Sequence, residues 1–384
     1  MSDASAPIVV VAPNSFKGSL SALGAANAIA AGLRRVWPEA DVRIRPMADG
    51  GDGTLDAVLS VGGERRTARV AGAVGIPVDA AYGLIDGDTA VLESAQVVGL
   101  TDSVATAREL EERSTRGLGE LMDALLREGI RRFLVGLGGS STNDGGAGLL
   151  SALGVKLLDA NGSTVAPTPK KLAALARVEA GAVVRRLAGA HITILSDVDN
   201  PLCGERGATA IFGPQKGVRA QSVAAVDATL RHFATLAEAA LGRSVRERPG
   251  AGAAGGLGFA LMLLGGEIRS GADVVADLIG LDAALAGADW LITGEGRSDR
   301  QTLLGKAPLV AARRANAKAV PATLLSGAVE RNDLPELSKV FAGCESILFG
   351  PSTLEDCVND AAALLADRAE QLARLFAAAR ANRR

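Results

Sequence analysis

Five polar loops rich in glycine interrupt the sequence, and they constrain the fold more than any other feature. They cover residues 13–19, 48–54, 138–146, 196–201 and 294–299. Four of them follow a short apolar run and precede a segment with helical periodicity. This repeated order of strand, loop and helix predicts an α/β fold with parallel strands. Because ligands bind beyond the carboxyl ends of the strands in such sheets, the loops are the candidate ligand-binding segments.

The length of the chain and its middle region predict two domains. At 384 residues the chain exceeds the ordinary size of one domain. Residues 64–100 are typical of short antiparallel strands, whereas both ends keep the α/β pattern. We expect a discontinuous Rossmann-like domain from residues 1–66 and 287–384, with an inserted mixed α/β domain from residues 67–286. The expected active site lies in the cleft between them.

Composition and charge exclude several classes of protein. The formal net charge is -2 and aromatic residues make up 3%, so neither a basic stripe nor a stacking platform for nucleic acid is expected. Three cysteines without a pattern predict neither a zinc site nor a disulfide framework. From the first residues we expect no signal peptide, and no apolar run reaches membrane-spanning length. We expect a cytoplasmic protein with no nucleic-acid or membrane partner, and a homodimer is compatible with the sequence.

Familiar catalytic motifs are missing from the sequence. Gly305 and Lys306 are followed by alanine, so no P-loop of the form GxxxxGK[ST] is formed. The sequence holds two histidines, His191 and His232, and both lie outside the glycine-rich loops. Histidine-based acid–base chemistry and a Ser-His-Asp triad are therefore not expected.

The first two loops offer a cation and a pair of carboxylates. Lys17 stands just before a predicted helix, where its ammonium group and the free N–H groups of the helix could bind an anion together. Asp49 and Asp52 alternate with glycines, a pattern that suits a Mg²⁺ or hydroxyl-binding turn. The simpler interpretations are a solvated lysine and an aspartate that caps a helix.

The third loop is the strongest local signal, because four glycines flank five small polar residues. Successive backbone N–H groups in such a loop can form a nest that binds phosphate. The candidate binding residues here are Gly138, Gly139, Ser140, Ser141, Thr142, Asn143 and Asp144.

The last two loops add further charges. Asp197 and Asp199 alternate, so one of the two reaches a site on one side of an extended segment, and Lys216 supplies a second cation downstream. The fifth loop and the residues after it contain Glu295, Arg297, Asp299 and Lys306. Together the loops hold carboxylates for Mg²⁺, and cations and N–H groups for phosphates, which are the groups that phosphoryl transfer requires. The same groups could bind a sugar phosphate without turnover.

Six segments resemble the bacterial glycerate kinase family of the first type. They are APNSFKGSLSA, ADGGDGT, GLGGSSTNDGGAGLLSALG, SDVDNPLCGERGATAIFGPQKG, GAAGGLG and ITGEGRSDRQTLLGKAP, in this order along the chain. The resemblance implies two α/β domains and transfer of the γ-phosphoryl group of ATP to D-glycerate with Mg²⁺, most often giving 2-phosphoglycerate. The sequence departs from the family pattern at Asn14, where aspartate is frequent, at Asp52, where glutamate is frequent, and around Asp299 at Ser298 and Arg300.

With this resemblance, each candidate residue has an expected role. We expect Arg297 or Lys17 to bind the glycerate carboxylate, and Asp197 or Asp49 to orient or deprotonate the attacking hydroxyl. Glu295 or Asp299 is expected to hold Mg²⁺, while the 138–146 loop binds phosphates. Asn14, Ser15, Lys216 and Lys306 complete the expected substrate and nucleotide contacts. The alternatives are a kinase for another small hydroxy acid and a non-catalytic sensor of sugar acids.

Overall fold

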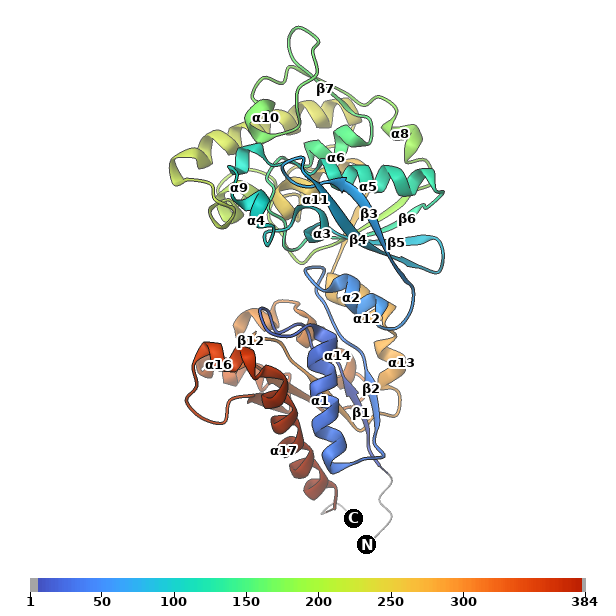
Figure 1. Cartoon of the computed structure of the whole chain (residues 1–384), viewed down its shortest axis with the longest axis vertical. Helices are drawn as coiled ribbons and strands as arrows, with labels where there is room; N and C mark the ends of the chain where they lie inside the picture. Colours follow the sequence, from blue (N-terminus) through green and yellow to red (C-terminus); the bar gives the residue numbers. More distant parts are fainter. Residues whose placement is uncertain (1–5, 382–384) are drawn as a thin grey trace. The chain divides into compact units, whose positions relative to one another are not determined.

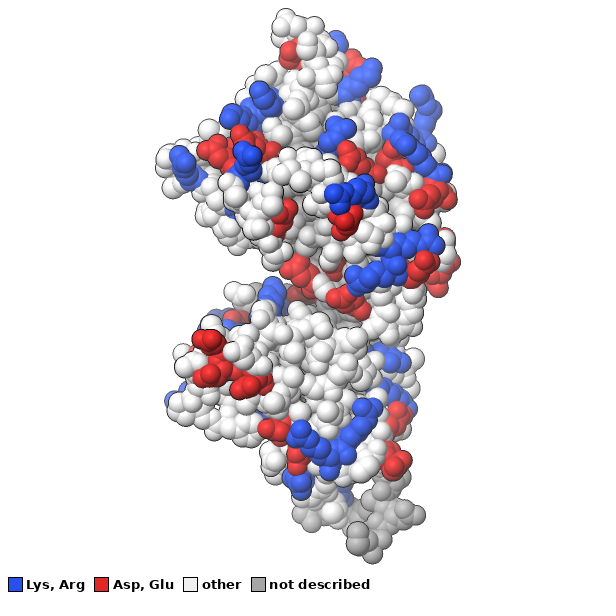
Figure 2. Space-filling view, viewed as in Figure 1, with Lys and Arg blue, Asp and Glu red and all other residues white. Residues whose placement is uncertain are grey.

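A computed structural model describes residues 6–381, and the chain forms two compact units. Unit 1 contains the residues up to 49, residues 56–61 and the residues from 272 onward. Unit 2 contains residues 50–55 and 62–271. Acidic and basic side chains are interspersed over the visible surface of each unit (Figure 2), which agrees with the nearly neutral net charge.

Unit 1 is built on a five-stranded sheet in which all strands are parallel, in the order β15, β13, β11, β1, β2. The strands are β1 (Ile8–Val11), β2 (Asp41–Ile44), β11 (Trp290–Thr293), β13 (Ala322–Ser326) and β15 (Gly343–Ser346). The apolar residues of the three central strands β1, β11 and β13 are almost all buried, as expected for strands covered on both faces, whereas the edge strands β2 and β15 are partly exposed. The predicted α/β fold with parallel strands is therefore confirmed for this unit.

The helices of unit 1 cover this sheet. α1 (Ala22–Val36) packs against α17 (Ala361–Ala381), and the two helices run side by side in Figure 1. α14 (Ala307–Asn316) packs on β11 and β13. The remaining elements are α2 (Thr54–Leu59), α12 (Gly271–Leu278), α13 (Leu281–Leu285), α15 (Leu334–Leu337), α16 (Leu354–Asn359), β12 (Arg297–Ser298) and β14 (Ala328–Val329).

Both tryptophans of the chain lie at the contact of α1 and α17 with the sheet. The indole of Trp290 stacks on Phe376 of α17, with ring centroids 4.7 Å apart and an interplanar angle of 6°. Trp37, which follows α1, meets the same phenyl ring edge-on at 6.2 Å. Close helix packing and aromatic contacts thus hold unit 1 together on this side.

Unit 2 contains a six-stranded mixed sheet in the order β10, β9, β6, β5, β4, β3. Its strands are β3 (Glu64–Ala71), β4 (Pro77–Ile85), β5 (Thr89–Glu93), β6 (Arg132–Gly136), β9 (His191–Leu195) and β10 (Glu267–Arg269). β3, β4 and β5 pair antiparallel, which confirms the antiparallel strands predicted over residues 64–100. The other pairs are parallel.

Helices and a small two-stranded sheet complete unit 2. Its buried core includes Phe233 and Phe259, whose rings meet edge-on at 6.2 Å. The helices are α3 (Ala95–Val98), α4 (Ser103–Thr106), α5 (Arg116–Arg127), α6 (Ala147–Ala152), α7 (Pro169–Leu172), α8 (Val183–Arg186), α9 (Ala208–Phe212), α10 (Val223–Leu241) and α11 (Leu257–Leu263). The small sheet pairs β7 (Lys156–Leu158) antiparallel with β8 (Arg177–Glu179).

The compact units divide at somewhat different residues from the domain boundaries predicted at 66 and 286. β3 starts at Glu64 and pairs along its length with β4, so the strand lies wholly in unit 2. Residues 272–286 lie in unit 1, where Arg314 of α14 donates hydrogen bonds to Asp277 (2.8 Å) and Asp282 (3.0 Å). The interdomain active site expected from the sequence stays a prediction.

Within residues 6–381, no helix is long and apolar enough to cross a membrane. The three cysteines, Cys203, Cys344 and Cys357, are all free thiols.

Candidate active site

A cavity of about 400 Å³ in unit 1 brings together three of the loops singled out in the sequence. Loop one, the end of the segment after β2, and loop five all contribute side chains to its wall. The candidate residues that line it are Asn14, Ser15, Lys17, Asp49, Glu295, Arg297 and Lys306. The sequence therefore named seven residues that the fold of unit 1 places in one cavity.

Backbone hydrogen bonds join loop one to loop five. The N–H of Asn14 donates to the carbonyl of Gly294 at 2.8 Å, and the Asn14 Oδ1 accepts from the N–H of Ser15 at 2.7 Å. The parallel pairing of β1 with β11 sets this contact, since both loops leave the sheet at the same edge. Lys17 was expected just before the helix. In the structure, a tight turn between Phe16 and Leu20 separates the exposed lysine from the start of α1.

Glu295 is the most buried carboxylate in this cavity. Its Oε1 accepts hydrogen bonds from the hydroxyls of Thr302 (2.7 Å) and Ser298 (3.3 Å), and its Oε2 lies 3.6 Å from Lys306 Nζ. Burial raises the pKa of the Glu295 carboxyl, while the Thr302 hydrogen bond and the Lys306 charge oppose the shift. Lys306 is also the residue at which α14 begins. The cavity thus holds a fixed carboxylate beside a cation.

Asp299 and Arg297, also expected in the site, are used in local contacts. The Asp299 carboxylate caps a short 3-10 helix, residues 300–303, by accepting a hydrogen bond from the N–H of Gln301 at 2.8 Å. Its own N–H donates to Thr302 Oγ1 at 3.1 Å. Arg297 is exposed and forms an ion pair with Glu330 at 3.0 Å, although it lines the cavity. Capping therefore accounts for Asp299 without a metal ion.

The carboxylates around the cavity fit a Mg²⁺ ion that is held mainly by phosphates. Within residues 6–381, no group of three or more His, Cys, Asp or Glu side chains could hold a metal by itself. However, Asp49 and Glu295 both line the cavity, and the negative charge of Asp49 contributes to the raised pKa of Glu295. A divalent cation relieves such repulsion, and Mg²⁺ usually binds through one or two carboxylates plus substrate phosphates.

A second, smaller cavity of about 140 Å³ lies in unit 2. Gly138, Gly139 and Ser140 of loop three line it together with Gln215 and Lys216. Lys216 is buried, and its Nζ donates to Ser140 Oγ (3.0 Å) and to the carbonyl of Thr142 (2.8 Å). Burial lowers the pKa of this ammonium group from 10.5 to about 7. Since a buried cation gains from a nearby negative charge, this cavity suits an anion.

Gly139 is required at its position for two reasons. Its φ is +74°, a left-handed conformation that side chains rarely adopt. A Cβ at this residue would also lie 2.5 Å from Oδ1 of Asp52. The exposed Asp52 of loop two thus lies beside loop three, in unit 2.

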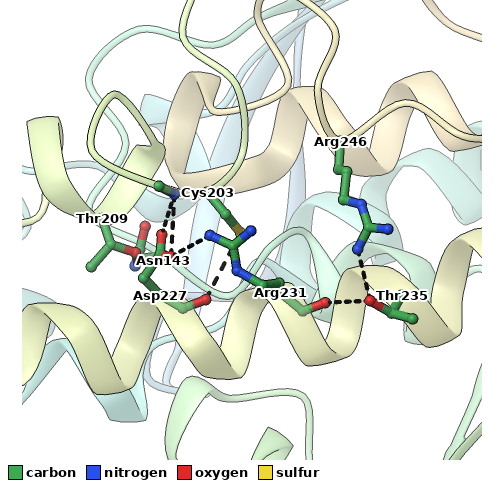
Figure 3. Close-up of polar contacts among 8 residues, drawn as sticks. Asn143, Cys203, Thr209, Asp227, Arg231, Thr235 and Arg246 are labelled. Atoms are coloured by element: carbon green, nitrogen blue, oxygen red, sulfur yellow. Dashed lines mark hydrogen bonds and ion pairs between the residues drawn. The ribbon is translucent and has the colours of Figure 1, made fainter.

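Three of the remaining polar side chains of loop three, those of Ser141, Asn143 and Asp144, form hydrogen bonds inside the protein. Ser141 Oγ donates to the carbonyl of Val98 at 2.9 Å, and Asn143 Nδ2 donates to Thr209 Oγ1 at 2.9 Å (Figure 3). Ser141, Thr142, Asn143 and Asp144 are all buried. Their direct contact with a ligand, expected from the sequence, stays a prediction. The hydrogen bonds of Ser141, Asn143 and Asp144 hold the loop whose first residues line the cavity.

Asp144 has the most extensive contacts of these side chains. Its carboxylate accepts hydrogen bonds from the N–H groups of Thr115 (2.8 Å), Gly146 (2.9 Å) and Gly148 (3.1 Å). Burial raises the pKa of the Asp144 carboxyl, against these hydrogen bonds, which lower it. The loop therefore depends on one buried acid for three backbone donors.

Replacing Asp144 by alanine should destabilise unit 2 by about 3–5 kcal/mol, because the three N–H donors would stay buried without an acceptor. Amide hydrogen exchange measured on peptides from residues 113–149 should show faster exchange than in the wild type. Asp159→Ala, in a turn, is the control and should leave these peptides unchanged. Equal protection in both variants would contradict this role.

Arg113 has a structural role at this site that sequence reasoning missed. The buried guanidinium donates from Nη1 to the carbonyls of Ser141 (3.0 Å) and Lys216 (3.1 Å), and from Nη2 to that of Arg108 (2.8 Å). It therefore joins three segments around the smaller cavity. The sequence around it, EERST, carries no motif, and two of its partners, Ser141 and Lys216, are distant in the chain, so no local signal could have revealed it.

The segment that follows loop four is held to α10 by a separate set of polar contacts. Asp227 of α10 accepts a hydrogen bond from the N–H of Gly204 at 3.0 Å and one from Arg231 at 3.1 Å (Figure 3). Asp197 is exposed and directly precedes Val198, which lines the smaller cavity. Asp199 is also exposed and pairs with Arg206 at 3.4 Å. Val198 lies between the two acids, so both are adjacent to a residue of the cavity wall.

Comparison with known proteins finds similarity along nearly the whole chain to one protein family. Residues 9–377 match a family described as the glycerate kinase family. A glycerate kinase of Bacillus subtilis is 41% identical over 368 residues, covering 95% of this chain and 96% of its own length. Glycerate 2-kinase of Escherichia coli is 40% identical over 324 residues, covering 84% and 85%. A crystal structure from Salmonella typhimurium LT2, which carries a provisional glycerate kinase 2 name, matches with a TM-score of 0.85 and 38% identity, covering 98% of this chain and 100% of that one.

Proposed function

The chain belongs to the glycerate kinase family, and on that premise we propose that it transfers the γ-phosphoryl group of ATP to D-glycerate, giving 2-phosphoglycerate. One observation carries the proposal most directly. The cavity of unit 1 holds two lysines, Lys17 and Lys306, beside two carboxylates, Asp49 and Glu295. Cations for phosphates and carboxylates for Mg²⁺ are the groups that phosphoryl transfer needs.

ATP and Mg²⁺ bind in this cavity of unit 1. Lys17 and Lys306 bind phosphate oxygens, and Asp49 and Glu295 hold the metal ion. When bound, Mg²⁺ neutralises charge on the phosphate oxygens. This replaces the pair Glu295 and Asp299 expected from the sequence, since Asp299 caps residues 300–303 and Asp49 lines the cavity.

The smaller cavity of unit 2 binds an anionic group of a substrate, through the backbone of Gly138 and Gly139 and the ammonium group of Lys216. Because Lys17 binds a phosphate of ATP here, Arg297, which lines the same cavity, is the cation of the expected pair that binds the carboxylate of glycerate. Because Asp49 is assigned to the metal ion, Asp197 is the expected carboxylate that orients the attacking hydroxyl and accepts its proton. Phosphoryl transfer has a loose transition state, so a carboxylate of ordinary basicity is sufficient.

A coupled assay of ADP release tests these roles. Lys17→Ala and Asp197→Asn should each lower turnover on D-glycerate by at least about 100-fold, since each removes a group that binds charge or positions the nucleophile. Two exposed residues of the same types provide matched controls: Lys318→Ala and Asp199→Asn should keep wild-type turnover.

Near wild-type turnover in both site variants would contradict the assigned roles. If a panel of small hydroxy acids is turned over faster than D-glycerate, the chain is a kinase for another acceptor. A sugar-acid sensor would show a thermal shift with its ligand but no consumption of ATP.

A further inference from the structure

The cavity of unit 1 has two chemically different walls. One wall is polar and contains the lysines and carboxylates described above. The other wall is apolar and comes from the last part of the chain. It consists of Ile347, Leu348, Leu354, Cys357, Val358 and Ala361.

The apolar wall is assembled from the residues after β15, from α16 and from the start of α17. Leu354, the first residue of α16, is 81% exposed although it lines the cavity. Within the described residues, no other side chain covers most of this leucine where it faces the cavity. A large exposed apolar side chain at the edge of a polar site is typical of a surface that a ligand covers.

We propose that this apolar wall binds the adenine base of ATP, with Lys17 and Lys306 of the same cavity binding its phosphates. The inference rests on the proposed function and adds the location of the base. Purines have two flat apolar faces, whereas glycerate is small and polar throughout and gains little from an apolar wall. The volume of about 400 Å³ also lies in the usual range for nucleotide-sized ligands.

Charge agrees with this choice of ligand. The triphosphate is strongly anionic, and the two lysines are in the cavity that the apolar wall completes. Lys306 already contacts Glu295 at 3.6 Å, so its ammonium group is directed to the carboxylate that would face the metal–phosphate complex. A ligand with one apolar end and one anionic end therefore matches both walls.

Cys357 gives a direct readout, because it is a partly exposed thiol on the apolar wall. The full chain is alkylated with N-ethylmaleimide, and the rates at Cys357 and Cys344 are followed by peptide mass spectrometry. Adenosine and ATP, each at about ten times its dissociation constant, should slow alkylation of Cys357 about tenfold. Inorganic triphosphate and D-glycerate should not slow it. Cys344, which does not line the cavity, is the internal reference and should react at an unchanged rate.

A pair of exposed leucines gives an independent test. Leu354→Ser should raise KM for ATP about fivefold and leave KM for D-glycerate unchanged, because one apolar contact to the base is lost. Leu375→Ser, on the exposed side of α17, is the matched control and should change neither constant. Both leucines are largely exposed, so neither substitution should unfold the protein.

The inference is overturned if adenosine leaves the Cys357 rate unchanged, or if Leu354→Ser raises KM for D-glycerate instead of KM for ATP. Protection by inorganic triphosphate alone would also overturn it, since phosphates rather than the base would then cover the wall. An enzyme that consumes ATP with D-glycerate but shows any of these results retains the proposed function. Loss of ATP consumption with D-glycerate in the wild type would instead refute the proposed function itself.

Discussion

Lys216→Met is expected to lower kcat/KM about 10²- to 10³-fold, the effect of removing one charged donor from an anion-binding site. Lys216 is buried in the wall of the smaller cavity, where it donates to Ser140 and Thr142. Arg113 is a second buried cation beside Lys216. Asp144 is the nearby acid, and its negative charge raises the pKa of Lys216. An anionic substrate group would therefore enter a region with more positive than negative charge.

The same substitution should not destabilise the fold, which separates its effect from simple unfolding. Burying an ammonium group is costly, and methionine fills a similar volume without a charge. We expect an unfolding midpoint by circular dichroism at least as high as that of the wild type. Lys156→Met, at an exposed lysine of unit 2, is the control and should keep full activity. An inactive Lys216 variant with a lowered midpoint would contradict the role in substrate binding.

Stability should also depend on pH through Lys216. Burial lowers its pKa from 10.5 to about 7, while Asp144 raises it and Arg113 lowers it further. Between these two values the unfolded chain holds a proton that the folded chain has lost. The free energy of unfolding therefore rises with pH from about 7 toward 10.5 in the wild type. In Lys216→Met this rise should be missing, so the difference between the two pH profiles isolates the group.

Gly32→Ala should destabilise unit 1 by about 2–4 kcal/mol, although alanine is favoured over glycine in a helix. A Cβ at this position of α1 would lie 2.0 Å from the carbonyl oxygen of Ala366 in α17. The two helices would have to move apart, and the contacts of Trp290 and Trp37 with Phe376 would be strained. The cost of the clash exceeds the gain in helix propensity of about 1 kcal/mol.

Tryptophan fluorescence during urea unfolding measures this effect in unit 1 alone, because both tryptophans of the chain lie there. Gly24→Ala on the same helix is the matched control. Its Cβ would come no closer than 3.2 Å to Ser21 Oγ, so its stability should stay within about 1 kcal/mol of the wild type. Equal midpoints for the two variants would show that α1 and α17 do not pack as closely as described.

The sequence predicted the sheet elements and the loops well because both depend on local patterns. Apolar runs such as residues 8–12 become strands, and the glycine-rich loops follow them at the carboxyl ends. In unit 1 the parallel pairing of β1 with β11 then brings loops one and five together, although about 280 residues separate them. Local periodicity, together with the rule that ligands bind beyond the carboxyl ends of parallel strands, was sufficient to predict which loops line this cavity.

The orientation of side chains within loop three could not be predicted in the same way. Ser141, Asn143 and Asp144 find partners at Val98, Thr209 and Thr115, which are distant in sequence. A run of small polar residues is equally compatible with a ligand and with such internal contacts. Arg113 was missed for the same reason.

Asp299 is different, because its capping role could have been predicted from the neighbouring residues in the sequence. Aspartate followed three residues later by Thr302 is a capping pattern, and the structure shows both hydrogen bonds of that motif. Recognising it would have moved the metal-binding prediction away from Asp299.

The central claim is that the chain phosphorylates D-glycerate with ATP, and phosphorus NMR of the reaction mixture tests it most directly. With ATP, Mg²⁺ and D-glycerate, the γ-phosphate resonance of ATP should disappear while those of ADP and 2-phosphoglycerate grow in equal amounts. A product resonance of 3-phosphoglycerate would contradict the proposed position of transfer. Unchanged ATP resonances in the presence of D-glycerate would contradict the account as a whole.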